Sequence, residues 1–203
     1  MRARAIAAGL ATGALACAGA LTGCGDSSPP TSSAIRALEA EARPIGRGAR
    51  FQAPVRGRPL GHCSRRLGPR RAAHVELFAE NRVMLVTAGV GVRAPLRYSD
   101  GRIVSAHCYG ALVTLDPTGV VLVRPRSRLT LAALFRSWGE PLSPTDLAGF
   151  SAGRERRVRV YIDGRPEHSD PRAIRLTDHA EIVLEVGPHV PPHHGYTFPP
   201  ERS

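Results

Sequence analysis

Two cysteines, each directly preceded by a histidine, are the residues of this chain best suited to chemistry. They form the pairs His62-Cys63 and His107-Cys108. In an oxidising compartment two such thiols favour a disulfide, which here would tie an Arg-, Gly- and Pro-rich segment to a strand. Two thiolates and two imidazoles could instead make a tetrahedral zinc or copper(I) site. Neighbouring side chains of a strand point to opposite faces, so a His-Cys pair is poorly placed to bind one ion, and we expect the disulfide.

The histidines offer only weak sets of metal ligands. The candidates lie in an expected strand, beside the second cysteine and in a Pro-rich tail: His74, His107, His189, His193 and His194. His-rich tracts can bind copper or zinc weakly, but a solvated tail is the plainer interpretation of the last three. A metal-binding role is therefore kept as an alternative.

No catalytic arrangement stands out. Serine, histidine and aspartate all occur, but no Gly-x-Ser-x-Gly frames a nucleophile. No glycine pattern lies between a strand and a helix to bind phosphate. The sequence leans away from an enzyme and predicts neither a catalytic residue nor a cofactor.

Cys24 closes an uncharged apolar run that follows Arg2 and Arg4. The run ends in Leu21-Thr22-Gly23-Cys24, which resembles the bacterial lipobox, where a prolipoprotein is acylated on cysteine and cut just before it. A membrane-spanning helix needs about 20 apolar residues, and this run is shorter and rich in glycine. We expect residues 1–23 to be a lipoprotein signal peptide and Cys24 to carry acyl chains such as palmitate, since stable anchoring takes more than one chain. An uncleaved anchor and a plain secretory peptide are the alternatives.

The chain is strongly basic, with 28 basic and 17 acidic residues and a formal net charge of +11. Every basic residue is arginine, which is typical of GC-rich coding and weakens arguments from arginine abundance. For an exported domain nucleic acid is a poor partner, and an aromatic content of 5% argues against a stacking surface for single strands. Anionic lipid or an acidic cell-wall polymer fits a membrane-tethered protein better. A solvated basic surface is the simpler alternative.

Composition divides the mature chain into three parts. Residues 24–71 begin with the lipidated cysteine, continue as a Ser- and Pro-rich flexible linker and end in an irregular lead-in. Residues 72–187 carry the apolar periodicity of a globular domain. Residues 188–203 form a Pro/His-rich tail, which we expect to be extended and to lie on the domain through Tyr196 and Phe198.

The globular part alternates strands with one good helix. Strands are expected at 74–79, 83–86, 102–109, 112–115, 120–123, 157–162 and 181–186. The helix is expected after Thr130, with its end at Gly139 and Trp138 on its apolar face, in the core. A short helical turn is expected at 145–147.

This order predicts an α+β fold: a small mixed β-sheet with one main packed helix. The β-grasp arrangement is one form of it, built from the hairpin at 112–123, the helix and the last two strands. The earlier strands, at 74–92, are then expected to extend the sheet or to form a small hairpin layer.

Several short motifs resemble a group of uncharacterised bacterial proteins, secreted or membrane-anchored and best represented in high-GC actinobacteria. The matching residues are His74, Phe78, Ala88-Gly89-Val90-Gly91-Val92, Asp116, Thr118-Gly119-Val120, Leu131–Gly139 and parts of 158–187. The resemblance implies their fold and extracytoplasmic address. The group has His-x-His pairs where this chain has Ala72, Val113 and Leu115, so the resemblance carries no metal site over.

The sequence thus predicts a lipid-anchored extracytoplasmic protein of the cell membrane with a binding or structural role. An extracytoplasmic protein that binds copper or zinc is the alternative.

Overall fold

The computed structural model describes residues 43–153, 157–190 and 196–198. They belong to one compact unit, Glu41–Ser203. Cys24, His193 and His194 lie outside the described residues. Among the described helices none has the length and apolar character that crossing a membrane requires.

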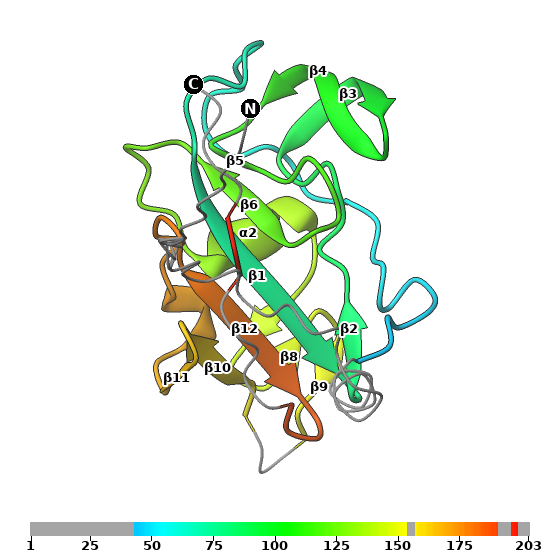
Figure 1. Cartoon of the computed structure of the whole chain (residues 1–203), viewed down its shortest axis with the longest axis vertical. Coiled ribbons are helices and arrows are strands. Elements are labelled where there is room, and N and C mark those ends of the chain that lie inside the picture. The colour runs from blue at the N-terminus through cyan, green and yellow to red at the C-terminus, as the bar shows by residue number, and fades with distance from the viewer. Residues whose placement is uncertain (1–42, 154–156, 191–195, 199–203) are drawn as a thin grey trace, which may run out of the picture. The chain divides into compact units, whose positions relative to one another are not determined.

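The fold is α+β, and the described residues form one α-helix, which lies behind a mixed sheet (Figure 1). The main sheet has the order β11-β10-β12-β1-β6-β5, with β2 paired to β1. Its strands are β1 (Arg71–Ala79), β2 (Arg82–Met84), β5 (Leu112–Val113), β6 (Val120–Val123), β10 (Arg159–Ile162), β11 (Arg165–Glu167) and β12 (Glu181–Val186).

Strand β1 lies at the centre of this sheet. It pairs in parallel with β12 on one side and antiparallel with β6 and β2 on the other. The expectation that this segment joins the sheet is therefore confirmed for β1 and β2. Because β1 lies between β12 and β6, the 112–123 hairpin is not next to the last strand, as a β-grasp unit of these elements would require. No residue of β1 is exposed, and most are buried, on both faces of the strand. A strand covered on both faces belongs inside a sheet.

Helix α2 (Leu131–Trp138) packs on one face of the sheet and forms most of the core with it. Trp138 is 0% exposed and its indole N–H donates to the carbonyl of Ala53 at 3.0 Å, which confirms the predicted core position. Gly139 ends the helix with φ +92°, as expected. Thr130 precedes the helix, but its hydroxyl makes no capping hydrogen bond.

A hairpin of β3 (Val92–Ser99) and β4 (Arg102–Tyr109) lies at one end of the molecule (Figure 1). The expected disulfide Cys63–Cys108 joins it to the lead-in segment. That segment contributes Phe51 and Ala53 to the main core.

Arg70 forms a second link between the lead-in segment and the end of the hairpin. Its guanidinium donates to the carbonyls of Leu67, Gly110 and Ala111 at 2.9–3.2 Å. Burial lowers the pKa of Arg70 to about 10, with Arg124 adding repulsion, so the group stays charged at neutral pH. The lead-in is thereby held to the residues before β5 by the partly buried guanidinium of Arg70 as well as by the disulfide.

Two short elements complete the described chain. A three-stranded sheet consists of β7 (Leu142–Ser143), β8 (Asp146–Leu147) and β9 (Phe150–Ser151), and the 3-10 helix η1 spans Pro171–Ala173. The helical turn predicted at 145–147 is wrong, because Asp146 and Leu147 pair with β7 and β9. Because Glu41–Ser203 is a compact unit by itself, we expect it to fold without residues 1–40.

Candidate metal centre

The sheet face opposite α2 carries an unusual set of polar side chains. Successive residues of a strand alternate between faces. Val75 and Leu77 of β1 therefore pack in the main core on the helix side, and His74 and Glu76 lie on the opposite face of the sheet. The parallel register places Glu181 of β12 directly beside His74. Pairing of these two strands thus brings together residues that lie more than a hundred positions apart in the chain.

His74, Glu76 and Glu181 each offer one potential ligand atom, and these atoms lie within 4.8 Å of one another. His74 is 4% exposed and Glu181 6%, whereas the side chain of Glu76 is 25% exposed. A pocket of about 120 Å³, lined in part by His74, Glu76, Thr118 and Gly119, opens beside them. The cluster is therefore mostly shielded from water but accessible from one side.

The hydrogen bonds of His74 define which ring nitrogen is available. Its Nε2 lies 2.9 Å from the carbonyl oxygen of Thr118, and because a carbonyl can only accept, Nε2 carries the proton. In the neutral ring Nδ1 then holds a lone pair, and it lies 4.0 Å from the Glu76 carboxylate. Nδ1 of His74 and Oε2 of Glu76 are both buried, and neither has a hydrogen-bond partner in the described part of the protein.

Glu181, the third member of the cluster, contacts the C-terminal segment. The backbone N–H of Tyr196 donates to Oε2 of Glu181 at 2.9 Å. The Tyr196 ring stacks on His74 with 3.9 Å between ring centroids. Tyr196 therefore orients both His74 and Glu181, and the expectation that the tail lies on the domain is confirmed for this residue.

Gly119 shapes the turn that presents the Thr118 carbonyl. It has φ +82°, and a Cβ at this position would lie 2.5 Å from the Val75 carbonyl oxygen and 3.1 Å from Nε2 of His74. Only glycine fits here, because a side chain would be strained by the backbone angle and would also press on the imidazole.

We expect Gly119→Ala to lower the free energy of unfolding by at least about 1 kcal/mol more than Gly101→Ala. Gly101 also has a positive φ, +77°, but nothing lies within 4 Å of its added Cβ, so it reports the backbone strain alone. Urea denaturation of the two variants measures the difference. Equal destabilisation would show that the turn has room beside His74.

A second polar cluster on the same sheet face is fully paired. Glu185 is 1% exposed, and its carboxylate accepts from Arg159 at 2.9 Å and from the backbone N–H of Val190 at 3.2 Å. Nδ1 of His189 lies 3.0 Å from the same carboxylate. His189 therefore pairs with Glu185 and is not part of the cluster around His74.

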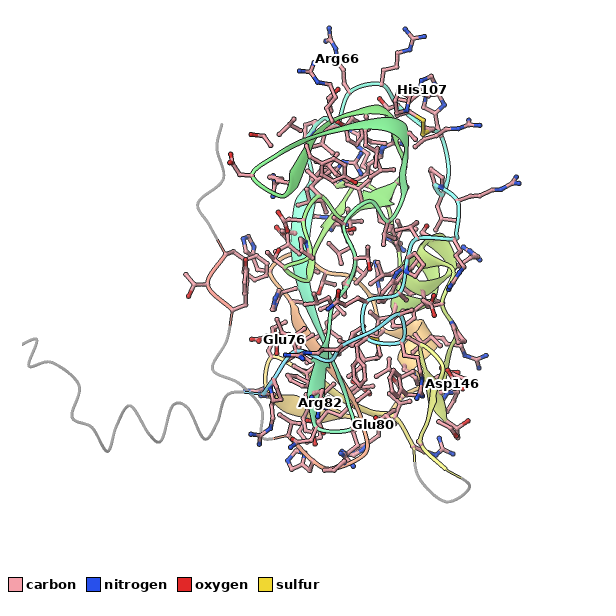
Figure 2. The ribbon with its side chains drawn as sticks, turned by 90° about the vertical axis from the view of Figure 1, so that its right-hand side faces the viewer. Arg66, Glu76, Glu80, Arg82, His107 and Asp146 are labelled. Atoms are coloured by element: carbon pink, nitrogen blue, oxygen red, sulfur yellow. A yellow bond between two sulfur atoms is a disulfide. The ribbon has the colours of Figure 1, made fainter. Side chains whose placement is uncertain are left out.

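The remaining predicted ligands are not brought together. The thiols of Cys63 and Cys108 are joined to each other, so the alternative tetrahedral site with His62 and His107 does not exist. His107 is exposed at the hairpin end of the molecule (Figure 2). Sequence analysis missed Glu76 and Glu181; the His-x-Glu spacing of one strand was a usable signal for Glu76, but nothing local pointed to Glu181.

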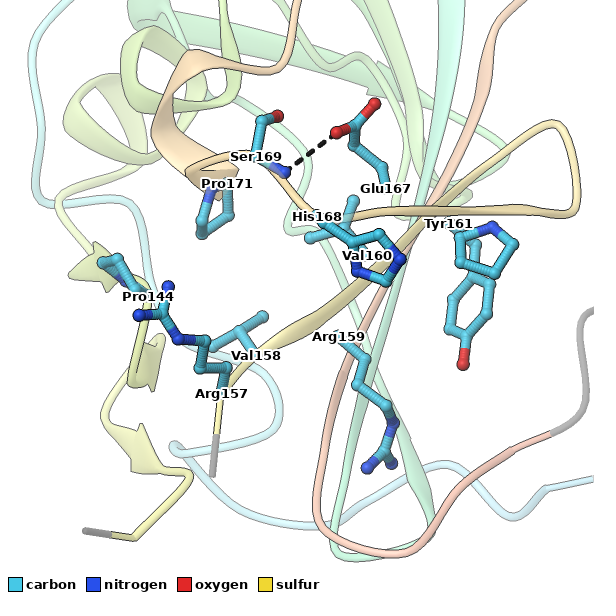
Figure 3. A pocket seen from close by; sticks show the side chains of 11 residues that line it. Pro144, Arg157, Val158, Arg159, Val160, Tyr161, Glu167, His168, Ser169 and Pro171 are labelled. Atoms are coloured by element: carbon cyan, nitrogen blue, oxygen red, sulfur yellow. Dashed lines mark hydrogen bonds between the residues drawn. The ribbon is translucent and has the colours of Figure 1, made fainter. Parts of the chain in front are cut away.

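Another pocket lies at the edge of the sheet, where β10 and β11 meet the segment before η1 (Figure 3). Its volume is about 160 Å³, and Val158, Val160 and Pro171 line it with Arg157 and His168. This is below the roughly 300–1,000 Å³ of a typical small-molecule site. The pocket beside His74 is smaller still, but it adjoins the one group of three potential metal ligands found among the described residues, and the pocket at the sheet edge does not.

Comparisons with protein-family models, curated proteins and solved structures gave no match. The resemblance to the actinobacterial group accordingly stays a prediction based on its motifs.

Proposed function

We propose that this protein is an exported, lipid-anchored domain that binds one divalent transition-metal ion, zinc fitting best, through His74, Glu76 and Glu181. The observation that carries the proposal is the buried Nδ1 of His74, which has no hydrogen-bond partner among the described residues and lies beside a carboxylate. An unsatisfied buried acceptor costs about 1–3 kcal/mol, and a cation between the lone pairs removes that cost.

Both the donor set and its surroundings suit zinc. Imidazole nitrogen and carboxylate oxygen are ordinary zinc ligands, and three protein ligands with one open position are a common arrangement. The Nε2–H bond to the Thr118 carbonyl is the kind of outer contact that fixes a ligating histidine in one tautomer. In a tetrahedral site with ligand atoms about 2.1 Å from the ion, these atoms lie about 3.4 Å apart. Binding therefore requires the side chains of the cluster, whose ligand atoms are now up to 4.8 Å apart, to move together.

We expect the unlipidated protein, residues 25–203 made without a His-tag, to bind one equivalent of zinc after treatment with a chelator. Competition with a chromophoric chelator measures the affinity, and elemental analysis the stoichiometry. His74→Gln should weaken binding at least a hundredfold, because the nitrogen ligand is lost. The matched control is His107→Gln, which removes an exposed histidine far from the site and should leave the affinity unchanged.

Three results would contradict the proposal. Wild-type protein that retains less than a tenth of an equivalent has no such site. Loss of binding in a variant lacking His193 and His194 would assign it to the tail. A Glu181→Gln variant that binds zinc as tightly as wild type would show that Glu181 is not a ligand and that the proposed ligand set is wrong.

The export and lipid anchor are part of the same proposal. They are supported by the disulfide, since such bonds persist in oxidising compartments, and by the lipobox-like residues before Cys24. Mass spectrometry of the membrane fraction should find a chain that begins at acylated Cys24. An unmodified chain beginning at Met1 in cytosolic extract would contradict this part while leaving the metal test intact.

A further inference from the structure

We propose that the end of the domain formed by the β3–β4 hairpin and residues 56–71 is a docking surface for an anionic phospholipid bilayer. This surface, here called the hairpin end, does not involve the metal centre. The proposal rests on the proposed membrane anchor, which would bring this surface close to a bilayer. It can nevertheless be tested on protein that carries no lipid.

Charge is concentrated at the hairpin end. Residues 56–71 contribute six arginines and no acidic residue, and residues 92–109 contribute three arginines and only Asp100. The disulfide Cys63–Cys108 and backbone hydrogen bonds between Ser64 and Tyr109 hold the two segments together. Arg66 and His107 lie at this end, whereas Glu80, Arg82 and Asp146 lie at the opposite end, where the charges are mixed (Figure 2).

Five of these arginines are exposed and have no ion-pair partner in the described part of the protein: Arg58 in the lead-in, and four in or beside the hairpin. These four are Arg65, Arg66, Arg93 and Arg97. Arg102, by contrast, is paired with Asp116. Basic residues close to an anionic leaflet attract it strongly and within a Debye length, so these guanidinium groups at one end give the surface a preferred orientation.

Apolar side chains at the same end favour a bilayer over a soluble polyanion. The described residues have three exposed large hydrophobic side chains, and two of them, Tyr98 and Val104, flank the turn of this hairpin at 57% exposure each. Ile103 and Leu96 of the same hairpin pack on a small core with Leu115 and fix its position. An exposed tyrosine among arginines suits the lipid interface, where the ring enters the head-group region while its hydroxyl stays wet.

The test is sedimentation of unlipidated residues 25–203 with vesicles of phosphatidylcholine containing about a third phosphatidylglycerol, against pure phosphatidylcholine. We expect binding to the anionic vesicles only, weakening as salt is raised. The variant R65Q/R66Q/R93Q/R97Q should lose at least tenfold in partition coefficient. The control R47Q/R136Q/R165Q/R175Q removes the same charge from exposed arginines elsewhere and should stay within about threefold of wild type.

A Tyr98→Trp variant reports insertion directly, because Trp138 is buried and contributes a constant background. The fluorescence of the introduced indole should shift to the blue on anionic vesicles. Thermal melting of each variant confirms that it is folded.

Three outcomes would overturn the proposal. Equal loss of binding in both four-arginine variants would favour general charge attraction. Retention of vesicle binding by the hairpin-end variant would place the contact elsewhere. An indole signal in the Tyr98→Trp variant that responds to a soluble acidic polymer but not to vesicles would replace the bilayer by a polyanion.

Discussion

The substitution Trp138→Ala is expected to lower the free energy of unfolding by about 3–5 kcal/mol, the range typical of deleting a large buried aromatic side chain. Trp138 is fully buried, its ring lies 5.8 Å from that of Phe135, and its N–H bond to the Ala53 carbonyl ties the lead-in to the helix. The variant loses apolar contact and one of the two hydrogen bonds that this carbonyl accepts, the other coming from the Thr87 hydroxyl. For a domain of this size the melting temperature should fall by roughly 10 °C.

Arg136→Ala is the matched control, because Arg136 belongs to the same helix but is exposed. It should change stability by less than about 0.5 kcal/mol. Trp138→Phe should fall between the two, since it keeps most of the apolar area and loses the hydrogen bond. A melting temperature that barely moves in Trp138→Ala would place the tryptophan at the surface and contradict the packing of α2.

Removal of the disulfide should cost nearly as much. The bond joins residues 45 positions apart, and the chain-entropy account gives about 4 kcal/mol for a loop of that size. The double variant Cys63→Ala/Cys108→Ala should be destabilised by this order of magnitude in urea under non-reducing conditions. Wild-type protein unfolded in excess reductant should behave like the variant.

A thiol reagent added to unfolded, non-reduced residues 25–203 provides an independent measurement. We expect no free thiol, because both cysteines of that chain are in the bond. Two reactive thiols per chain would contradict the disulfide. Unchanged stability of the double variant, with the bond present in wild type, would instead mean that the lead-in stays docked through Arg70 and Phe51 without it.

Local signals predicted several elements well. Helix α2 ends at Gly139, and the turn between β5 and β6 uses Asp116, Pro117 and Gly119, because capping and turn chemistry depend on a few adjacent residues. Strand β3 was missed, since Pro95 and the polar residues around it hide its alternation. The two-stranded sheet tolerates that proline because, among the described strands, β3 pairs with β4 alone and leaves its other side without a ladder.

The central place of β1 was beyond the reach of sequence reasoning. Its apolar residues predict a strand, but which strands become its neighbours depends on pairing across the chain, with β12 about a hundred residues away. The same limit applied to β8, where a two-residue strand and a helical turn have nearly the same local pattern.

By itself the sequence determined helix α2, most strands of the main sheet, the α+β class and the pairing of the two cysteines, because periodicity, capping and the count of available thiols are local or additive properties. The tertiary structure alone decided that His74 meets Glu181 and that Thr118 fixes its ring. The physical reason is that a binding site is defined by distances between side chains. Those distances follow from the register of β1 against β12 and from the turn at Gly119, and neither is written in the spacing of residues along the chain.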